Sequence, residues 1–308
     1  GESKPLPIWR GQGVRFLSFF QLGASEVGDP PLDPDRMPID TITHLGRRAE
    51  SMTDMPKTPD RQILLNVPIM LSTRYIPAGW ESLRETISQT AQSFGTAVLD
   101  DPNIVVSTNF VGNFADSMQI IFRKVEELIS AGKSIVILSD IVQGQDSHRD
   151  IIPATLVVKL VDQYLKEKNL RRMASLVVES LEVASSPAVM KTIALGADAV
   201  SIDPRVILAA MGIGEYHVQT DPLLSHSVDL NEAHVRAHNL LISWTHQLKK
   251  LMGGADITDI NNLRGNMSLI QSLGLGGELA KALCVGDEGV GRRDWDFFVR
   301  RDITPFET

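Results

Sequence analysis

The chain has 308 residues, of which 43% are hydrophobic and 22% charged, with a formal net charge of −8 and a pI of about 5.4. This composition is that of a folded globular protein with one large domain or two small ones. The acidic balance argues against a nucleic-acid partner. The longest apolar runs, such as Ile63–Leu71, are too short to span a bilayer. The first ten residues contain no apolar signal core, and we expect a cytoplasmic protein.

Cysteine content limits the chemistry further. Cys284 is the only cysteine, so no disulfide can form within the chain. A cysteine-ligated iron–sulfur cluster or Cys₄ zinc site is excluded for the same reason. We therefore expect no iron–sulfur cluster and no metal site within this chain.

Residues 1–61 are predicted to form an N-terminal arm. Gly28–Pro38 contains four prolines, which fix φ and remove amide donors, so this stretch is predicted to be an extended surface loop. Within the arm, only Gly13–Gly23 is expected to form a strand or a buried segment.

From residue 62 onward, short apolar runs alternate with helical patterns. Strands are expected at Gln62–Leu71, Ile104–Phe110, Ser134–Asp140, Ala174–Ser180 and Ala197–Asp203. Helices are expected at Gly79–Gly95, Phe114–Gly132, Ile152–Leu170, Ser186–Gly196 and Pro204–Gly212. Strands that are apolar throughout and alternate with amphipathic helices indicate a parallel sheet, either a barrel or an open doubly wound sheet.

We predict the α/β class and a (β/α)8 TIM-barrel-like fold over residues 62–230. Only about five or six βα units are evident where a full barrel has eight, so either some strands are degenerate or the barrel is incomplete. Residues 231–308 are predicted to form a C-terminal extension. It contains a long helix at Glu232–Gly253, a short capped helix within Asp256–Asn266, and an aromatic, charged tail.

One stretch resembles a known family. "MKTIALGADAVSIDPRVILAAMGIG", Met190–Gly214, resembles the final βα unit of the FMN-binding barrel in the glutamate synthase large-subunit family. Leu65–Val98 looks like the first strand and helix of that barrel, and Glu232–Gly253 with "ITDINNLRGN" stands where the family has a long helix and a short element. The resemblance spans residues 62–270. In a barrel enzyme, a junction such as "ALGADAVSID" often sits beside a cofactor phosphate.

The resemblance implies a place for FMN at the carboxyl ends of the barrel strands. The loops after Leu71, Asp140, Ser180 and Asp203 would hold it. The positions that match the family's FMN site are Ser72, Thr73, Gln143, Gly144, Ser180, Asp203 and Arg205. Arg205 would bind an anion, or instead pair with Asp203 or Asp198. Lys191 would lie beneath the phosphate unit, or be an ordinary helix lysine.

Several of these positions depart from the family pattern. Where the family has Gly-Thr or Gly-Ser beside the phosphate, this chain has Asp203-Pro204, which adds a negative charge and removes an amide. A carboxylate at ~4 Å would oppose each phosphate charge by about 1–4 kcal/mol. A Gly-Gly turn is replaced by Glu179-Ser180, and a glycine-rich loop by Val142–Asp150. The family's cluster cysteines would fall within Gly214–Val228, which has none.

Two further groupings carry chemistry less clearly. His234 and His238 have the i, i+4 spacing of two zinc ligands, but Val235 stands where an HExxH motif has glutamate, so we interpret them as part of a polar helix face. Gln145–Asp150 collects a histidine, an arginine and two carboxylates, either as a catalytic loop or as a solvated loop that caps the next helix. No catalytic residue can be assigned from the sequence.

Two functions therefore stand side by side. In the first, the chain is a glutamate-synthase-like barrel that has lost FMN and the iron–sulfur cluster and serves as a structural or regulatory subunit of a larger complex. In the alternative, it is a divergent FMN-dependent oxidoreductase that acts on an amino acid or a similar small substrate, with electrons from a partner subunit. We expect other protein subunits or further copies of the chain as partners, with no nucleic acid and no membrane span.

Overall fold

The computed structural model describes residues 17, 20–22, 38–46, 61–76, 79–98, 100–141, 151–213, 229–272 and 286–287. Within these ranges no helix combines the length and the apolar character needed to cross a membrane.

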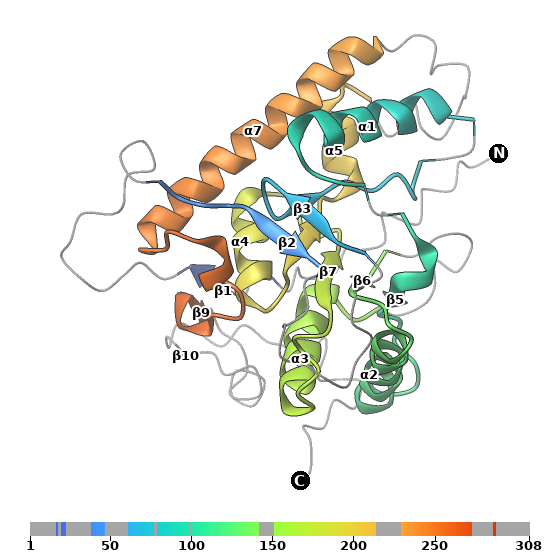
Figure 1. The fold of residues 1–308 in the computed structure, drawn as a ribbon, viewed down its shortest axis with the longest axis vertical. Helices are drawn as coiled ribbons and strands as arrows, with labels where there is room; N and C mark the ends of the chain where they lie inside the picture. Colours follow the sequence, from blue (N-terminus) through green and yellow to red (C-terminus); the bar gives the residue numbers. More distant parts are fainter. Residues whose placement is uncertain are drawn as a thin grey trace.

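A five-stranded parallel sheet forms the centre of the molecule (Figure 1). Its spatial order is β4-β8-β7-β6-β5, with the strands at Ile69–Met70 (β4), Val105–Ser107 (β5), Ile135–Ser139 (β6), Ser175–Glu179 (β7) and Ala199–Ser201 (β8). Because β8 pairs with β4, the first and last strands of the series are neighbours, as in a barrel. On the other side of β4, a single parallel bridge joins Leu71 to Val98 and occupies the place of a further strand.

A helix follows each of these strand positions. They are α1 (Glu81–Phe94), α2 (Phe114–Ser130), α3 (Ala154–Glu167), α4 (Ser186–Ala194) and α5 (Pro204–Ala210). Capping residues define several ends: the Asn113 side chain accepts the amide of Asp116 at the start of α2, and Gly95 ends α1 with a φ of 80°. The predicted α/β class and barrel-like arrangement are confirmed, and the described part of the barrel wall has five paired strands with one bridge beside β4.

A small antiparallel ribbon closes the amino-terminal end of the barrel. It consists of β2 (Thr43–Leu45) and β3 (Ile63–Leu65), and its inner side chains, Leu45 and Leu65, lie in the same buried cluster as the barrel-interior residues. Gly46 donates its amide to the Ser175 hydroxyl at the start of β7 (3.0 Å). The sequence prediction was wrong on two points here, because β2 lies inside the predicted arm and the run at 62–71 is two strands, β3 and β4.

The C-terminal part packs back onto the barrel. The long helix α7 (Leu230–Gly254) runs beside α1, α4 and α5, and Figure 1 shows it lying obliquely along α1. Two 3-10 turns follow, η5 (Ile260–Asn262) and η6 (Met267–Leu269). A second sheet has the order β1-β9-β10, in which Phe20–Leu22 (β1) is antiparallel to Ile270–Ser272 (β9), and Gly286–Asp287 (β10) is parallel to β9. The described parts of the N-terminal arm thus lie on this chain, and the boundaries near residues 61 and 230 stay predictions.

Candidate site at the carboxyl ends of the barrel strands

The carboxyl ends of the barrel strands carry four carboxylates. Asp100 follows the bridge at Val98, Asp140 follows β6, Glu179 ends β7, and Asp203 follows β8. Glu179 and Asp203 are each 1% exposed, and Asp140 is 9% exposed. This is the end of the barrel at which the sequence predicts a cofactor, and the partners of these four groups decide what it can bind.

Asp203 is the N-cap of α5. Its Oδ1 accepts the backbone amide of Arg205 at 2.9 Å, so the carboxylate sits at the helix N-terminus where a phosphate would otherwise bind. The Arg205 side chain folds back onto the same group, with its Nε 3.0 Å from Oδ1 and 2.9 Å from Oδ2. The structure shows the pairing with Asp203, one of the roles considered for Arg205, and anion binding by Arg205 stays a prediction. Its guanidinium is therefore engaged by a carboxylate of its own chain.

Glu179 is bound from three directions at the mouth of the barrel. Its Oε2 accepts the Tyr75 hydroxyl at 2.6 Å and the Ser139 hydroxyl at 2.7 Å, and it forms an ion pair with Arg74. Burial raises the pKa of Tyr75, and the Glu179 charge raises it further. Burial opposes the charge of Arg74, but the attraction of Glu179 outweighs it and raises the Arg74 pKa. The loop after β4 is thereby fastened across the mouth to β7.

Ser72 and Thr73, two of the predicted cofactor contacts, bind Asp100 in the structure. The Ser72 hydroxyl donates to Asp100 Oδ1 at 3.1 Å, and the Thr73 amide lies 3.0 and 3.1 Å from the two carboxylate oxygens. The Thr73 hydroxyl also donates to Asp100. The donors that could have held an anion after β4 are therefore committed within the chain.

Ser180, also predicted to contact the cofactor, binds Asp140. Its hydroxyl donates to Asp140 Oδ2 at 2.6 Å, and the amide of Ala154 donates to the same oxygen at 2.9 Å. Burial raises the pKa of Asp140 to about 6, although these hydrogen bonds favour its charged form. Asp140 links the end of β6, the start of α3 and the end of β7 in one buried contact.

Some predicted positions lie outside the described residues. These are Gln143 and Gly144, the rest of the loop 142–150, the segment 214–228 and Cys284. Across the ranges that are described, no three His, Cys, Asp or Glu side chains are grouped so that they could hold a metal ion.

The histidines and Lys191 have structural partners. His234 Nδ1 lies 2.8 Å from the Thr90 hydroxyl, and the His238 ring meets Phe94 edge-on at 5.5 Å, so both face α1. Lys191 donates to the carbonyl of Leu17 at 3.2 Å. Burial lowers the pKa of Lys191, although the Glu182 charge opposes this. Lys191 thus secures the N-terminal segment.

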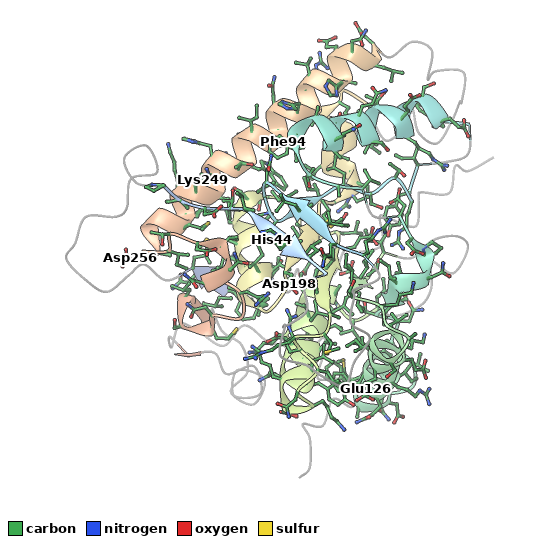
Figure 2. The ribbon with its side chains drawn as sticks, viewed as in Figure 1. His44, Phe94, Glu126, Asp198, Lys249 and Asp256 are labelled. Carbon is green, nitrogen blue, oxygen red and sulfur yellow. The ribbon has the colours of Figure 1, made fainter. Side chains whose placement is uncertain are left out.

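The "ALGAD" junction lies at the other end of the barrel, and sequence reasoning missed its role. Asp198 precedes β8 and accepts Arg171 Nη2 at 2.8 Å and the Leu176 amide at 2.7 Å, with Arg264 as a third partner. Burial opposes the Asp198 charge, but Arg171 and Arg264 outweigh it and lower the pKa. In Figure 2, Asp198 lies deep among the strands, whereas Glu126 and Lys249 lie at the periphery. Apart from residue types, no sequence signal pairs Asp198 with Arg264, which is 66 residues away.

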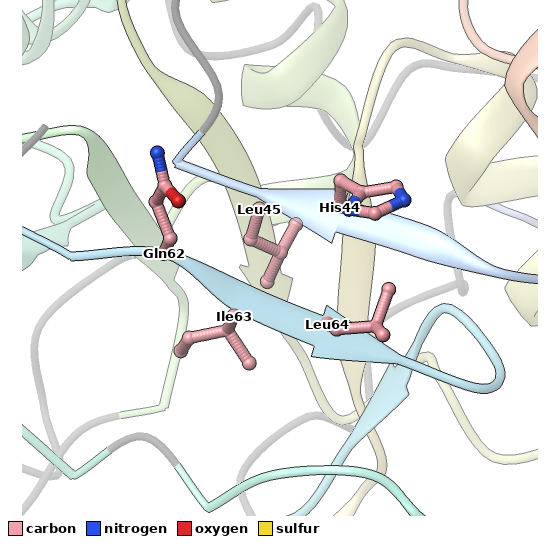
Figure 3. Close-up of a pocket in the computed structure, with 5 residues that line it drawn as sticks. All are labelled: His44, Leu45, Gln62, Ile63 and Leu64. Carbon is pink, nitrogen blue, oxygen red and sulfur yellow. The ribbon is translucent and has the colours of Figure 1, made fainter.

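A surface depression of about 330 Å³ lies on the β2–β3 ribbon (Figure 3). It is lined by His44, Leu45, Gln62, Ile63 and Leu64. Because the ribbon covers the amino-terminal end of the barrel, this depression lies away from the four carboxylates.

Relatives by sequence are glutamate synthases. The chain is 33% identical over 163 residues to the archaeal-type glutamate synthase (NADPH) of Thermotoga sp. (strain RQ2). The aligned residues make up 48% of this chain and 32% of that protein. It is 27% identical over 240 residues to the archaeal glutamate synthase (NADPH) of Archaeoglobus fulgidus, and the alignment covers 70% of this chain and 45% of that protein. It is 26% identical over 203 residues to the ferredoxin-dependent glutamate synthase of Cyanidium caldarium, and the alignment covers 65% of this chain and 12% of that protein. The chain spans less than half the length of each of these proteins.

Solved structures give a weaker likeness. A mandelate oxidase variant with an FMN adduct aligns at a TM-score of 0.41 and 10% identity, covering 81% of this chain and 87% of that one. A flavocytochrome b2 variant aligns at a TM-score of 0.35 and 18% identity, and the alignment covers 74% of this chain and 45% of that one.

The sequence also matches the family described as "Glutamate synthase central domain" over residues 1–276, nearly the whole chain. This chain therefore belongs to the glutamate synthase central domain family.

Proposed function

We propose that this chain is a flavin-free barrel domain with a structural or regulatory role in a glutamate synthase-type protein or complex. The observation that carries the proposal is the Asp203 carboxylate, which already occupies the amide at the N-terminus of α5. The partners would be other parts of the glutamate synthase or further copies of the chain, in the cytoplasm.

The residues present do not fit the phosphate of FMN. A phosphate at the end of β8 would face Asp203 at close range and lack the amide that Pro204 cannot supply. Like charges at ~4 Å oppose each other by about 1–4 kcal/mol for each pair. Arg205 already pairs with Asp203, which is 1% exposed, so its charge would neutralise a phosphate less completely. We assign no redox step to the described residues.

The same contacts suit a scaffold. Each carboxylate at the strand ends joins two or more elements: Glu179 joins β7, β6 and the loop after β4, and Asp140 joins β6, α3 and β7. Cross-links of this kind hold a barrel end in one shape without a ligand. A rigid barrel end is what a domain needs if its task is to position neighbouring parts of a larger protein.

The experiment is a flavin titration of natively purified protein, with the absorbance spectrum and the co-purifying chains recorded on the same sample. We expect no flavin bands, no saturable binding of added FMN, and a fixed set of partner chains. Stoichiometric flavin would favour the alternative, an FMN-dependent oxidoreductase acting on an amino acid or a similar small substrate. In that case Arg205→Glu would test the place of the site, since a phosphate at the end of β8 needs that cation.

A further inference from the structure

The turn after β7 joins different parts of the fold through three consecutive residues. The Ser180 hydroxyl donates to Asp140, at the end of β6, at 2.6 Å. The Leu181 carbonyl accepts Nη2 of Arg205, at the start of α5, at 3.4 Å. Glu182, the third residue, binds the N-terminal segment. The turn therefore lies between that segment and the groups at the mouth of the barrel.

Two charged side chains hold the peptide groups on either side of Leu17. Glu182 Oε2 accepts the Leu17 amide at 3.3 Å, and the same oxygen accepts the Thr155 hydroxyl at 2.5 Å. Lys191, on α4, donates to the Leu17 carbonyl at 3.2 Å. Hydrogen bonds to charged groups are stronger than those between neutral groups. The backbone at Leu17 is thus fixed relative to the turn, α3 and α4.

Apolar packing seats the same segment. Leu17 is 5% exposed and Phe20 is 1% exposed, and both belong to the main buried core. Phe20 also begins β1, which pairs with β9. Because the core and β9 hold this segment, Leu17 presents its amide to Glu182 from a fixed position.

A chain of hydrogen bonds leads from Glu182 to the mouth. The Glu182 amide donates to Ser180 Oγ at 3.2 Å, and the same hydroxyl donates to Asp140. One residue further along, the Val183 carbonyl accepts the Asp203 amide at 3.0 Å. A shift of the backbone at Glu182 would therefore disturb the contacts of both aspartates.

We propose that the N-terminal segment acts as a latch on the mouth of the barrel. The seating of Leu17 between Glu182 and Lys191 sets the conformation of the turn after β7. That conformation sets the contacts of Asp140 and Asp203. Coupling between two sites is reciprocal, so release of Leu17 loosens the mouth, and a change at the mouth weakens the hold on Leu17. The latch does not depend on whether the mouth binds flavin.

Hydrogen exchange of the full chain, followed at single amides by NMR, tests the latch. Lys191→Met removes the charge that binds the Leu17 carbonyl, keeps an unbranched apolar side chain and leaves the turn itself unchanged. We expect the amides of Leu17, Ala154 and Asp203 to exchange faster, by about fivefold or more. The Leu176 amide, which is bound at the other end of the barrel, should keep its rate.

Lys166→Met is the matched control. Lys166 also makes a contact from a helix to a single carboxylate, that of Asp162 at 2.6 Å, but it lies at the end of α3 remote from the mouth. The control should leave the two amides at the mouth unchanged. If Lys191→Met speeds exchange at Leu17 and leaves the two mouth amides at their wild-type rates, the segment only packs there and the proposal is overturned.

The reverse direction is tested without any change in the N-terminal segment or α4. Ser180→Ala removes the hydroxyl that links the Glu182 amide to Asp140 and should speed exchange at Leu17. Ser72→Ala removes another hydroxyl at the mouth, outside the turn, and should not. Equal exchange rates at Leu17 in the wild type and in Ser180→Ala would also overturn the latch. This arm decides the question if the lysine variant does not fold.

Discussion

Asp198 and Asp203 stand at opposite ends of the same short strand, β8, and the chain itself binds both carboxylates. Arg171 and Arg264 hold Asp198 where the strand begins, and Arg205 and the first turn of α5 hold Asp203 where it ends. The first contact ties the barrel to the C-terminal extension. The second contact occupies the N-terminus of α5 at the carboxyl end of the barrel.

Asp203→Ala should lower the free energy of unfolding by about 1–3 kcal/mol, because it removes a helix cap and the carboxylate that pairs with Arg205. Urea denaturation measures the loss. Asp101→Ala is the control, since Asp101 caps a short 3-10 helix through Asn103 and forms no ion pair with the other described residues. The control should lose about 1 kcal/mol or less. Equal losses in the two variants would contradict the role given to the Arg205 pair.

Asp198→Asn should be more damaging, with a loss of about 3–5 kcal/mol, because two arginines lose a buried counter-charge. Glu127→Gln is the comparison. Its ion pair with Arg123 is 4.0 Å long, both side chains are largely exposed, and its loss should cost no more than about 0.5 kcal/mol. If Asp198→Asn does not fold, Arg264→Gln measures the outer half of the network. The network would be shown to contribute little if Asp198→Asn or Arg264→Gln lowered the free energy of unfolding by no more than Glu127→Gln does.

Gly196 and Gly132 form a matched pair for backbone strain. Both have positive φ, 126° and 85°. A Cβ at Gly196 would lie 2.7 Å from Asp162 Cβ, whereas a Cβ at Gly132 meets nothing within 4 Å. Gly132→Ala should cost about 1–2 kcal/mol for the left-handed conformation alone. Gly196→Ala should cost about 3 kcal/mol or more, because the clash is added. Similar losses, measured by urea denaturation, would mean that α3 moves away from Gly196 easily.

The pH dependence of stability should carry the signature of Asp140. Its pKa is about 6 in the folded chain and 3.8 in the reference state, so the folded protein binds the extra proton between these values. Stability should therefore fall as pH rises from about 4 to about 6, by up to about 3 kcal/mol, and then level off. Asp198 acts in the opposite sense at lower pH, because its pKa is lowered from 3.8 and its contribution is lost only below that value. Asp140→Asn should flatten the curve between pH 4 and 6; an unchanged slope would exclude Asp140 as its source.

Local sequence patterns predicted the helices and the parallel strands well. Five helices and the barrel strands fall inside their predicted ranges because apolar runs and helical spacing directly reflect burial. The ribbon β2–β3 was not predicted. Thr43–Leu45 is three residues long, and its burial depends on Leu65 and the barrel interior, which lie far away in the sequence.

The structure places Ser72, Ser180 and Asp203 at the carboxyl ends of the strands, because parallel strands end on one face; their role as cofactor contacts stays a prediction. The sequence did not indicate their partners within the chain. It gave no sign that Asp100 would take the donors of Ser72 and Thr73, or that Arg74 and Tyr75 would reach Glu179, about 100 residues later. Such pairings depend on loop geometry that local patterns do not encode. The two aspartates of β8 also look alike in the sequence, and only the strand direction separates their roles.

The wall of the barrel is not equally strong around its circumference. Between β6 and β7 five residue pairs are in register, whereas the seam between β4 and β5 has a single bridge, from Leu71 to Val98, and no pairing of Val98 with β5 among the described residues. Amide hydrogens at that seam depend on few neighbours, so the Leu71 amide should exchange with deuterium earlier than those of β6 and β7. Under mechanical load we expect the wall of the barrel to open first at this weakly paired seam. A pulling experiment would then release the segment before β5 first and the β6–β7 pair last.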